Sequence, residues 1–121
     1  MTFSIDVDAA AAGLRVARLA GELDVSVYEQ VSEALQALER EEPRPHTVMV
    51  DLRGLTFMDS TGVRVLAEAH RRAKREGHRL TVVPGTGQPS RVIELLRLDG
   101  HVEMVADPDQ LEPWMEDPAA G

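Results

Sequence analysis

The chain has 121 residues, of which 43% are hydrophobic and 28% charged, so its size fits one folded domain and it is too apolar for a disordered chain. The net charge of −8 argues against nucleic acid as a partner, and the lack of cysteine excludes disulfides, thiol catalysis and thiolate metal sites. No apolar run approaches the roughly 20 residues that span a bilayer, and MTFSIDVD does not resemble a signal peptide, so we expect a cytoplasmic protein with no membrane partner.

The first part of the chain predicts two strands followed by a helix. Alternating apolar side chains predict an edge strand at residues 1–7, and an aliphatic run predicts a second strand at residues 14–20. The next residues, GELD at 21–24, predict a turn that contains a glycine. Ser26 and Glu29 then have the spacing of a capping box. Apolar side chains on one face of the following helix are Val27, Val31, Ala34, Leu35 and Leu38.

The rest of the chain predicts strands that alternate with helices. Buried strands are expected at residues 47–52 and 79–83, with a weaker strand at 101–105. Between the first two, residues 61–76 form an amphipathic helix pattern that ends at Gly77, after four cations that suit a helix C-terminus. A third helix is expected at residues 90–98, ending at Gly100, and a fourth at 108–115.

The element order β-β-α-β-α-β-α-β-α predicts an α/β domain. We expect a mixed β-sheet of about five strands covered by about four helices, because a helix that joins two strands allows them to pair in parallel. One domain should occupy residues 1–121, with its core at about 3–115 and a flexible tail at 116–121. Seven acids and no Lys or Arg follow from Asp99 onward, which indicates a solubilising segment rather than a docking site.

The start of the helix at residues 61–76 carries the most informative side chains. The sequence DSTG at 59–62 places a hydroxyl where backbone N–H groups and the helix dipole favour an anion. A phosphate on Ser60 would therefore fit there without unfolding the helix. Helix chemistry alone favours the simpler interpretation that Asp59 or Ser60 is an N-cap. In the same way, GELD alone favours a turn with Asp24 near a helix start.

The sequence does not support an enzyme, and we expect no catalytic residue, metal or cofactor. Ser60 lies outside a G-x-S-x-G pattern, and the glycine-containing segment at residues 85–90 lacks the spacing and lysine of nucleotide-binding loops. The only lysine, Lys74, falls inside a helix, which excludes a response-regulator receiver. Asp24, Asp51 and Asp59 are candidates for Mg²⁺, but carboxylates at strand ends are more often caps. The four histidines show no ligand-like spacing.

Several motifs together resemble the sulfate-transporter and anti-sigma factor antagonist (STAS) domain, and within it the stand-alone bacterial anti-sigma factor antagonists. They are GELD after the second strand, VDLRGLTFMDSTGV at residues 50–63, a basic helix that ends in glycine, the strand RLTVV, and PSRVIELL leading to LDG at 98–100. Their order and spacing match over nearly the whole chain.

The resemblance implies a phosphorylation switch. In that family a partner serine kinase, which is also the anti-sigma factor, phosphorylates the serine that corresponds to Ser60, and a separate serine phosphatase removes the phosphate. The unphosphorylated form binds the kinase and frees a sigma factor. Asp24 would lie near the phosphosite and contribute to kinase recognition. Asp59 and Gly62 match the same signature, and Thr61 is an alternative acceptor. We expect a monomer or weak dimer.

Two features leave room for another function. Arg53 and Arg64 put more positive charge near the expected phosphosite than many relatives have. The resemblance therefore does not specify the partner surface that would contact this site. The same fold also serves as a non-switching STAS subunit or scaffold of a larger complex, such as a lipid-transport assembly or a stress-signalling complex. The sequence therefore predicts an anti-sigma factor antagonist, with a structural STAS subunit as the alternative.

Overall fold

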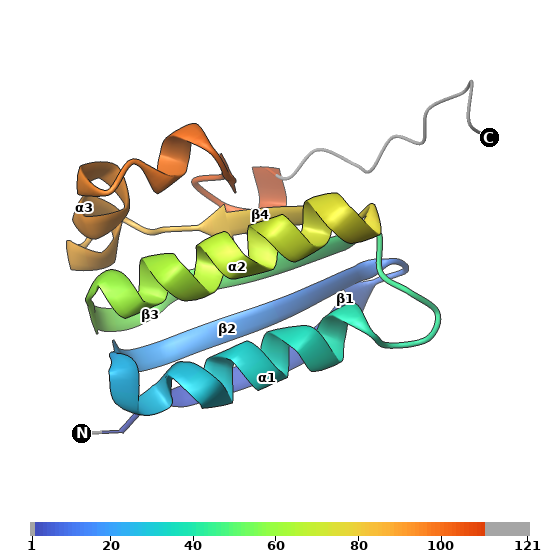
Figure 1. Cartoon of the computed structure of the whole chain (residues 1–121), viewed down its shortest axis with the longest axis horizontal. Coiled ribbons are helices and arrows are strands. Elements are labelled where there is room, and N and C mark those ends of the chain that lie inside the picture. The colour runs from blue at the N-terminus through green and yellow to red at the C-terminus, as the bar shows by residue number, and fades with distance from the viewer. Residues whose placement is uncertain (1, 111–121) are drawn as a thin grey trace.

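The strands form a single five-stranded sheet, and helices cover one of its faces (Figure 1). The computed structural model describes residues 2–110. The strands lie side by side in chain order: β1 (Ser4–Ala11), β2 (Leu14–Leu23), β3 (Thr47–Met58), β4 (Arg79–Val83) and β5 (Glu103–Met104). β1 runs antiparallel to β2, and the remaining neighbours run parallel. The predicted α/β class and mixed sheet are confirmed.

Three α-helices pack against the sheet within residues 2–110. They are α1 (Tyr28–Glu39), α2 (Ser60–Glu76) and α3 (Gln88–Leu95), and the 3-10 turns are η1 (Val25–Val27), η2 (Leu98–Gly100) and η3 (Pro108–Gln110). The third helix ends earlier than predicted, at Leu95, and η2 follows it. Of the helix predicted at residues 108–115, η3 is the described part; its remainder and the predicted tail lie outside the described residues.

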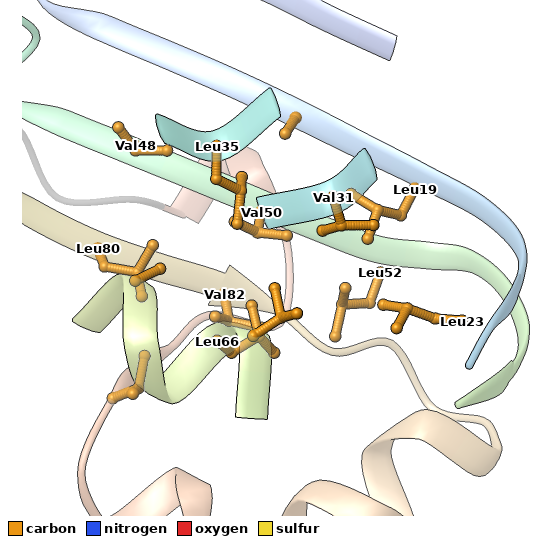
Figure 2. Close-up of a cluster of buried hydrophobic side chains, with 14 of the residues drawn as sticks. Leu19, Leu23, Val31, Leu35, Val48, Val50, Leu52, Leu66, Leu80 and Val82 are labelled. Atoms are coloured by element: carbon orange, nitrogen blue, oxygen red, sulfur yellow. The ribbon is translucent and has the colours of Figure 1, made fainter. Parts of the chain in front are cut away.

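Buried aliphatic side chains join these layers. Figure 2 shows Leu35 of α1 and Leu66 of α2 among side chains of the strands, including Val50 of β3. These three residues are at most 1% exposed. A buried side chain of this size contributes about 1.5–3 kcal/mol. The opposite face of the sheet carries a smaller buried cluster of Val16, Met49 and Val83.

One buried ion pair also connects α1 to α2. Arg72 donates from Nε to Glu39 Oε1 at 2.7 Å and from Nη2 to Glu39 Oε2 at 3.0 Å. The Glu39 side chain is only 3% exposed and that of Arg72 16%. From the sequence, Arg72 was one of the cations near a helix C-terminus. The structure shows that it neutralises a buried carboxylate on the neighbouring helix.

Strands β2 and β3 are longer than predicted, which corrects two interpretations. β2 continues through Gly21, Glu22 and Leu23, so GELD is mostly strand, and β3 continues to Met58 in place of the expected loop. Gly21 has a φ of 96°, and the register between the two strands shifts beside it. A glycine in this conformation accommodates a bulge, so pairing resumes beyond a residue that normally ends a strand.

No helix among residues 2–110 is both long and apolar enough to cross a membrane. α2 is the longest of them, with 17 residues.

Candidate functional site

The two predicted site segments meet at one edge of the sheet. Leu23 of β2 pairs with Met58 of β3, so Asp24 and Asp59 are the residues that follow two neighbouring strand ends. The Asp59 backbone N–H donates to the Leu23 carbonyl at 3.3 Å. The starts of α2 and α3 and the turn η1 gather at this same end of the sheet (Figure 1). Tertiary structure therefore places GELD beside DSTG.

Asp59, rather than Ser60, is the N-cap of α2. Its backbone is extended, and its Oδ1 accepts a hydrogen bond from the Thr61 N–H at 2.8 Å. Ser60 is consequently the first residue of the helix, and it is exposed. Its hydroxyl makes no hydrogen bond to any residue between 2 and 110. Because the cap is supplied by its neighbour, the Ser60 hydroxyl is free for another use.

Thr61 and Gly62 are less accessible than Ser60. Thr61 is half-buried and Gly62 is buried. A Cβ on Gly62 would lie 2.3 Å from both Cγ and Sδ of Met58, whose side chain is completely buried. The glycine therefore allows the first turn of α2 to pack closely on the end of β3. Gly62 is therefore required for packing inside the domain and is not placed to contact a partner.

Asp24 also has a local structural role. Its Oδ1 accepts hydrogen bonds from the Ser26 N–H at 2.9 Å and the Ser26 hydroxyl at 2.5 Å, so it caps η1. The predicted capping box of Ser26 and Glu29 is wrong, because α1 begins only at Tyr28 and Val27 at its N-cap has no side-chain cap bond. The hydroxyl bond and then the backbone bond from Ser26 lower the pKa of Asp24. Its carboxylate is therefore charged at neutral pH.

Gln88 is a site-positioning residue that the sequence did not reveal. Its side-chain Oε1 accepts from the Met58 N–H at 2.8 Å, and its Nε2 donates to the Met58 carbonyl at 2.9 Å. The first residue of α3 thereby holds the backbone immediately before the Asp59 cap. No local pattern marks Gln88, because its partner lies 30 residues away in sequence.

Of the two arginines expected near the phosphosite, Arg64 lies there. It follows Ser60 by one helical turn, and its guanidinium lies 4.5 Å from the centre of the Tyr28 ring. Its Nε is 3.5 Å from Oε2 of Glu68. The Tyr28 hydroxyl donates a hydrogen bond to Glu68, which raises the pKa of Tyr28. The first residue of α1 is therefore linked to α2 beside the candidate site.

Arg53 belongs to a different part of the molecule. It donates from Nε and Nη2 to Asp51 at 3.0 and 2.9 Å. Both residues line a cleft of about 450 Å³ with Asp107 and Asp109, next to the smaller buried cluster. Burial opposes ionisation of Asp51, but the hydrogen bonds from Arg53 outweigh it and the pKa of Asp51 is lowered. The expectation that Arg53 adds charge at the phosphosite is not supported.

The three aspartates considered for Mg²⁺ do not form a metal site in the part of the chain that the structure describes. Asp24 and Asp59 cap helical turns, and Asp51 is paired with Arg53. No group of three or more His, Asp or Glu side chains between residues 2 and 110 is arranged to hold a metal ion. The candidate site is thus an exposed hydroxyl flanked by two carboxylates.

A five-stranded α/β sheet with an exposed serine at the start of its second helix is the arrangement that the resemblance to the STAS domain predicted. Residues 5–106 match the family model described as Mlab, STAS domain, and the chain belongs to this STAS family. The resemblance inferred from its motifs is thereby confirmed at the level of the domain. No curated protein matches the sequence.

Solved structures show the same fold. The chain is similar to an anti-sigma factor antagonist from Mycobacterium paratuberculosis, with 23% identity, a TM-score of 0.79 and coverage of 89% of both chains. It is also similar to the Bacillus cell fate determinant SpoIIAA in its phosphorylated form, with 20% identity, a TM-score of 0.64 and coverage of 88% of this chain and 95% of SpoIIAA. Unphosphorylated SpoIIAA gives 20% identity and a TM-score of 0.67, with 88% and 92% covered.

Proposed function

We propose that this protein is an anti-sigma factor antagonist controlled by phosphorylation of Ser60. Unphosphorylated, it binds an anti-sigma factor that is a serine kinase, and a sigma factor is freed. Phosphorylation releases the antagonist, and a serine phosphatase restores it. The observation that carries this proposal is the Ser60 hydroxyl, which is exposed and makes no hydrogen bond within residues 2–110 at the first position of α2.

Accessibility favours Ser60 over Thr61 as the acceptor. Ser60 is exposed, whereas Thr61 is half-buried and its N–H is already bonded to the Asp59 cap. In the proposed step, Ser60 Oγ forms a bond to the γ-phosphorus of ATP held by the kinase. The hydroxyl proton passes to a base on the kinase, and ADP leaves. Hydrolysis by the phosphatase returns the hydroxyl and releases inorganic phosphate.

Charge explains how one phosphate can release a partner. The modification adds about −1.5 to −2 charge at neutral pH, next to Asp59 and across the strand end from Asp24. A partner surface that accepts a neutral hydroxyl then meets like charges and must desolvate a dianion. The fold itself need not change, because the hydroxyl makes no hydrogen bond that holds residues 2–110 together. SpoIIAA has been solved in both forms, which supports a switch on this fold.

The decisive measurement is partner affinity as a function of the state of Ser60. The partner is captured from host lysate, identified by mass spectrometry and purified. Binding is then compared for the parent, Ser60→Ala and protein with phosphoserine genetically encoded at position 60. We expect Ser60→Ala to bind like the parent and the phosphorylated form to bind about 100-fold more weakly, with a smaller difference at high salt.

Ser60→Ala incubated with the kinase and ATP is the matched control, since it offers no serine hydroxyl at position 60. It should retain its affinity while the parent loses affinity under the same conditions. Equal affinity of the parent, Ser60→Ala and the phosphoserine form would contradict the switch.

A non-switching STAS subunit of a larger complex is the second candidate, and the family description supports it. The matching family is described by the name Mlab and not as anti-sigma factor antagonists. Such a subunit, in a lipid-transport assembly or another complex, would bind a partner that is not a kinase. Its affinity would be independent of the phosphate on Ser60, so the same binding series distinguishes the two functions.

Asp24→Asn should separate the proposed recognition role of Asp24 from its capping role. Asparagine keeps an oxygen that accepts from Ser26 but removes the charge, so the free energy of unfolding should change by less than about 0.5 kcal/mol. We expect the kinase to phosphorylate this variant about 10-fold more slowly. Asp24→Ala should show the same slowing and also lose about 1 kcal/mol of stability with the cap.

Initial phosphorylation rates and urea unfolding provide these two measurements. Glu29→Gln is the control, because Glu29 is an exposed acid in the first turn of α1 and has no hydrogen-bond or ion-pair partner among the described side chains. A parental rate for Asp24→Asn would leave Asp24 with the capping role only.

A further inference from the structure

Arg64 is placed to bind a phosphate on Ser60 within the same molecule. The two residues are four apart in α2, so they lie on the same side of the helix about one turn apart, and a change of the Arg64 rotamer away from Glu68 can bring its guanidinium to Ser60. We propose that phosphorylation draws the Arg64 guanidinium away from Tyr28 and Glu68 and into an ion pair with the phosphate. This inference rests on the proposed function for the origin of the phosphate, but not for the contact itself.

The present contacts of Arg64 are weak enough to be exchanged. Its side chain is 64% exposed, and its Nε lies 3.5 Å from Glu68, which is a long surface ion pair. The contact with the Tyr28 ring is also a partly solvated one. A phosphate offers up to two negative charges and three acceptor oxygens to a guanidinium, which binds such groups in a bidentate manner. The phosphate is therefore the stronger partner.

Three other arginines, Arg53, Arg72 and Arg75, do not compete for this role. Arg53 is held by Asp51 on the cleft side of the sheet, and Arg72 is held by buried Glu39. Arg75 lies 15 positions beyond Ser60, about 22 Å along the helix axis. The acids at the site, Asp24 and Asp59, cap helical turns and repel a phosphate.

The exchange would give the switch two consequences. First, Arg64 would neutralise part of the added charge, so the repulsion felt by a partner is smaller than the phosphate alone would produce. Second, Tyr28 would lose its cation while keeping its hydrogen bond to Glu68. Tyr28 is the first residue of α1 and directly follows η1, which Asp24 caps. Phosphorylation of Ser60 would therefore also change the surroundings of the segment that carries Asp24.

Phosphoserine encoded at position 60 tests the contact without any kinase or partner. Phosphorus NMR follows the second ionisation of the phosphate in the otherwise unchanged protein, in Arg64→Gln and in Arg75→Gln as the matched control. We expect the phosphate pKa to be about 0.5 higher in Arg64→Gln and unchanged in Arg75→Gln, since a nearby cation favours the dianion. All three proteins should have the same circular dichroism spectrum, because both arginines are exposed.

Tyr28 supplies an independent signal because it is the only tyrosine in the sequence. Its ring proton resonances should shift when position 60 carries phosphate, in the parent and in Arg75→Gln but not in Arg64→Gln. A phosphate pKa unaffected by Arg64→Gln would overturn the proposal, and so would an equal rise in both variants, which would show a general charge effect. An equal partner affinity with and without the phosphate on Ser60 would contradict the proposed function. It would not bear on the contact between Arg64 and the phosphate.

Discussion

Arg72→Met should lower the free energy of unfolding by about 3–5 kcal/mol, the largest effect that we expect from one substitution. The substitution leaves the Glu39 carboxylate, 3% exposed, without the guanidinium that now binds both of its oxygens. A buried charge without a partner loses its hydration and gains nothing in return. Methionine keeps most of the aliphatic stem of arginine, so little of the loss comes from packing.

Urea unfolding of three further variants identifies the cause of this loss. Arg75→Met changes an exposed arginine in the same helix that makes no ion pair or side-chain hydrogen bond within residues 2–110, and it should stay within about 0.5 kcal/mol of the parent. The double variant Glu39→Met with Arg72→Met should recover most of the stability, because two apolar side chains can replace a buried ion pair at little cost. A loss below about 1 kcal/mol in Arg72→Met would show that Glu39 remains hydrated.

This ion pair bears on the proposed function because it connects α1 to α2. The connection between the two helices at the other end is the Tyr28 contact with Glu68 and Arg64, near Ser60. The position of η1 and Asp24 relative to the start of α2 depends on both attachments. Arg72→Met, studied at low temperature where it remains folded, should therefore also weaken partner binding if the proposed site is correct.

Gly21→Ala should destabilise the domain by about 3 kcal/mol. Gly21 has a φ of 96°, which side chains rarely adopt, and an alanine Cβ would lie 2.0 Å from the backbone carbonyl oxygen of Thr2. Backbone strain and the displacement of the chain entering β1 each cost about 1–3 kcal/mol. Thermal unfolding should show a decrease in Tm of more than about 10 °C for a domain of this size.

Gly100→Ala is the matched control for this glycine. No atom lies within 4 Å of a Cβ built on Gly100, and its backbone does not require a positive φ. Its stability should differ from the parent by less than about 0.5 kcal/mol. If Gly21→Ala behaves like Gly100→Ala, then β1 can move away from β2 at this point without cost. The expected result assigns the glycine of GELD to the sheet and leaves only Asp24 at the candidate site.

The sequence alone determined the elements whose signals are local. α2 was predicted within one residue, since its amphipathic repeat, its cap near Asp59 and its left-handed end at Gly77 all lie within or beside the helix. The hydroxyl of Ser60 at a helix start followed from the same pattern. The motifs also identified the STAS domain, because their order and spacing extend over most of the chain.

Tertiary structure decided which residues act on one another. It joined GELD to DSTG through the pairing of Leu23 with Met58, beyond a glycine that local rules take as the end of a strand. It chose Asp59 as the cap and left Ser60 free. The partners of Arg72 and Gln88 lie 33 and 30 residues away in sequence, and the charge or amide of a side chain does not specify which distant group will face it. Such pairings depend on the register of strands and the packing of helices, which are properties of the whole sheet.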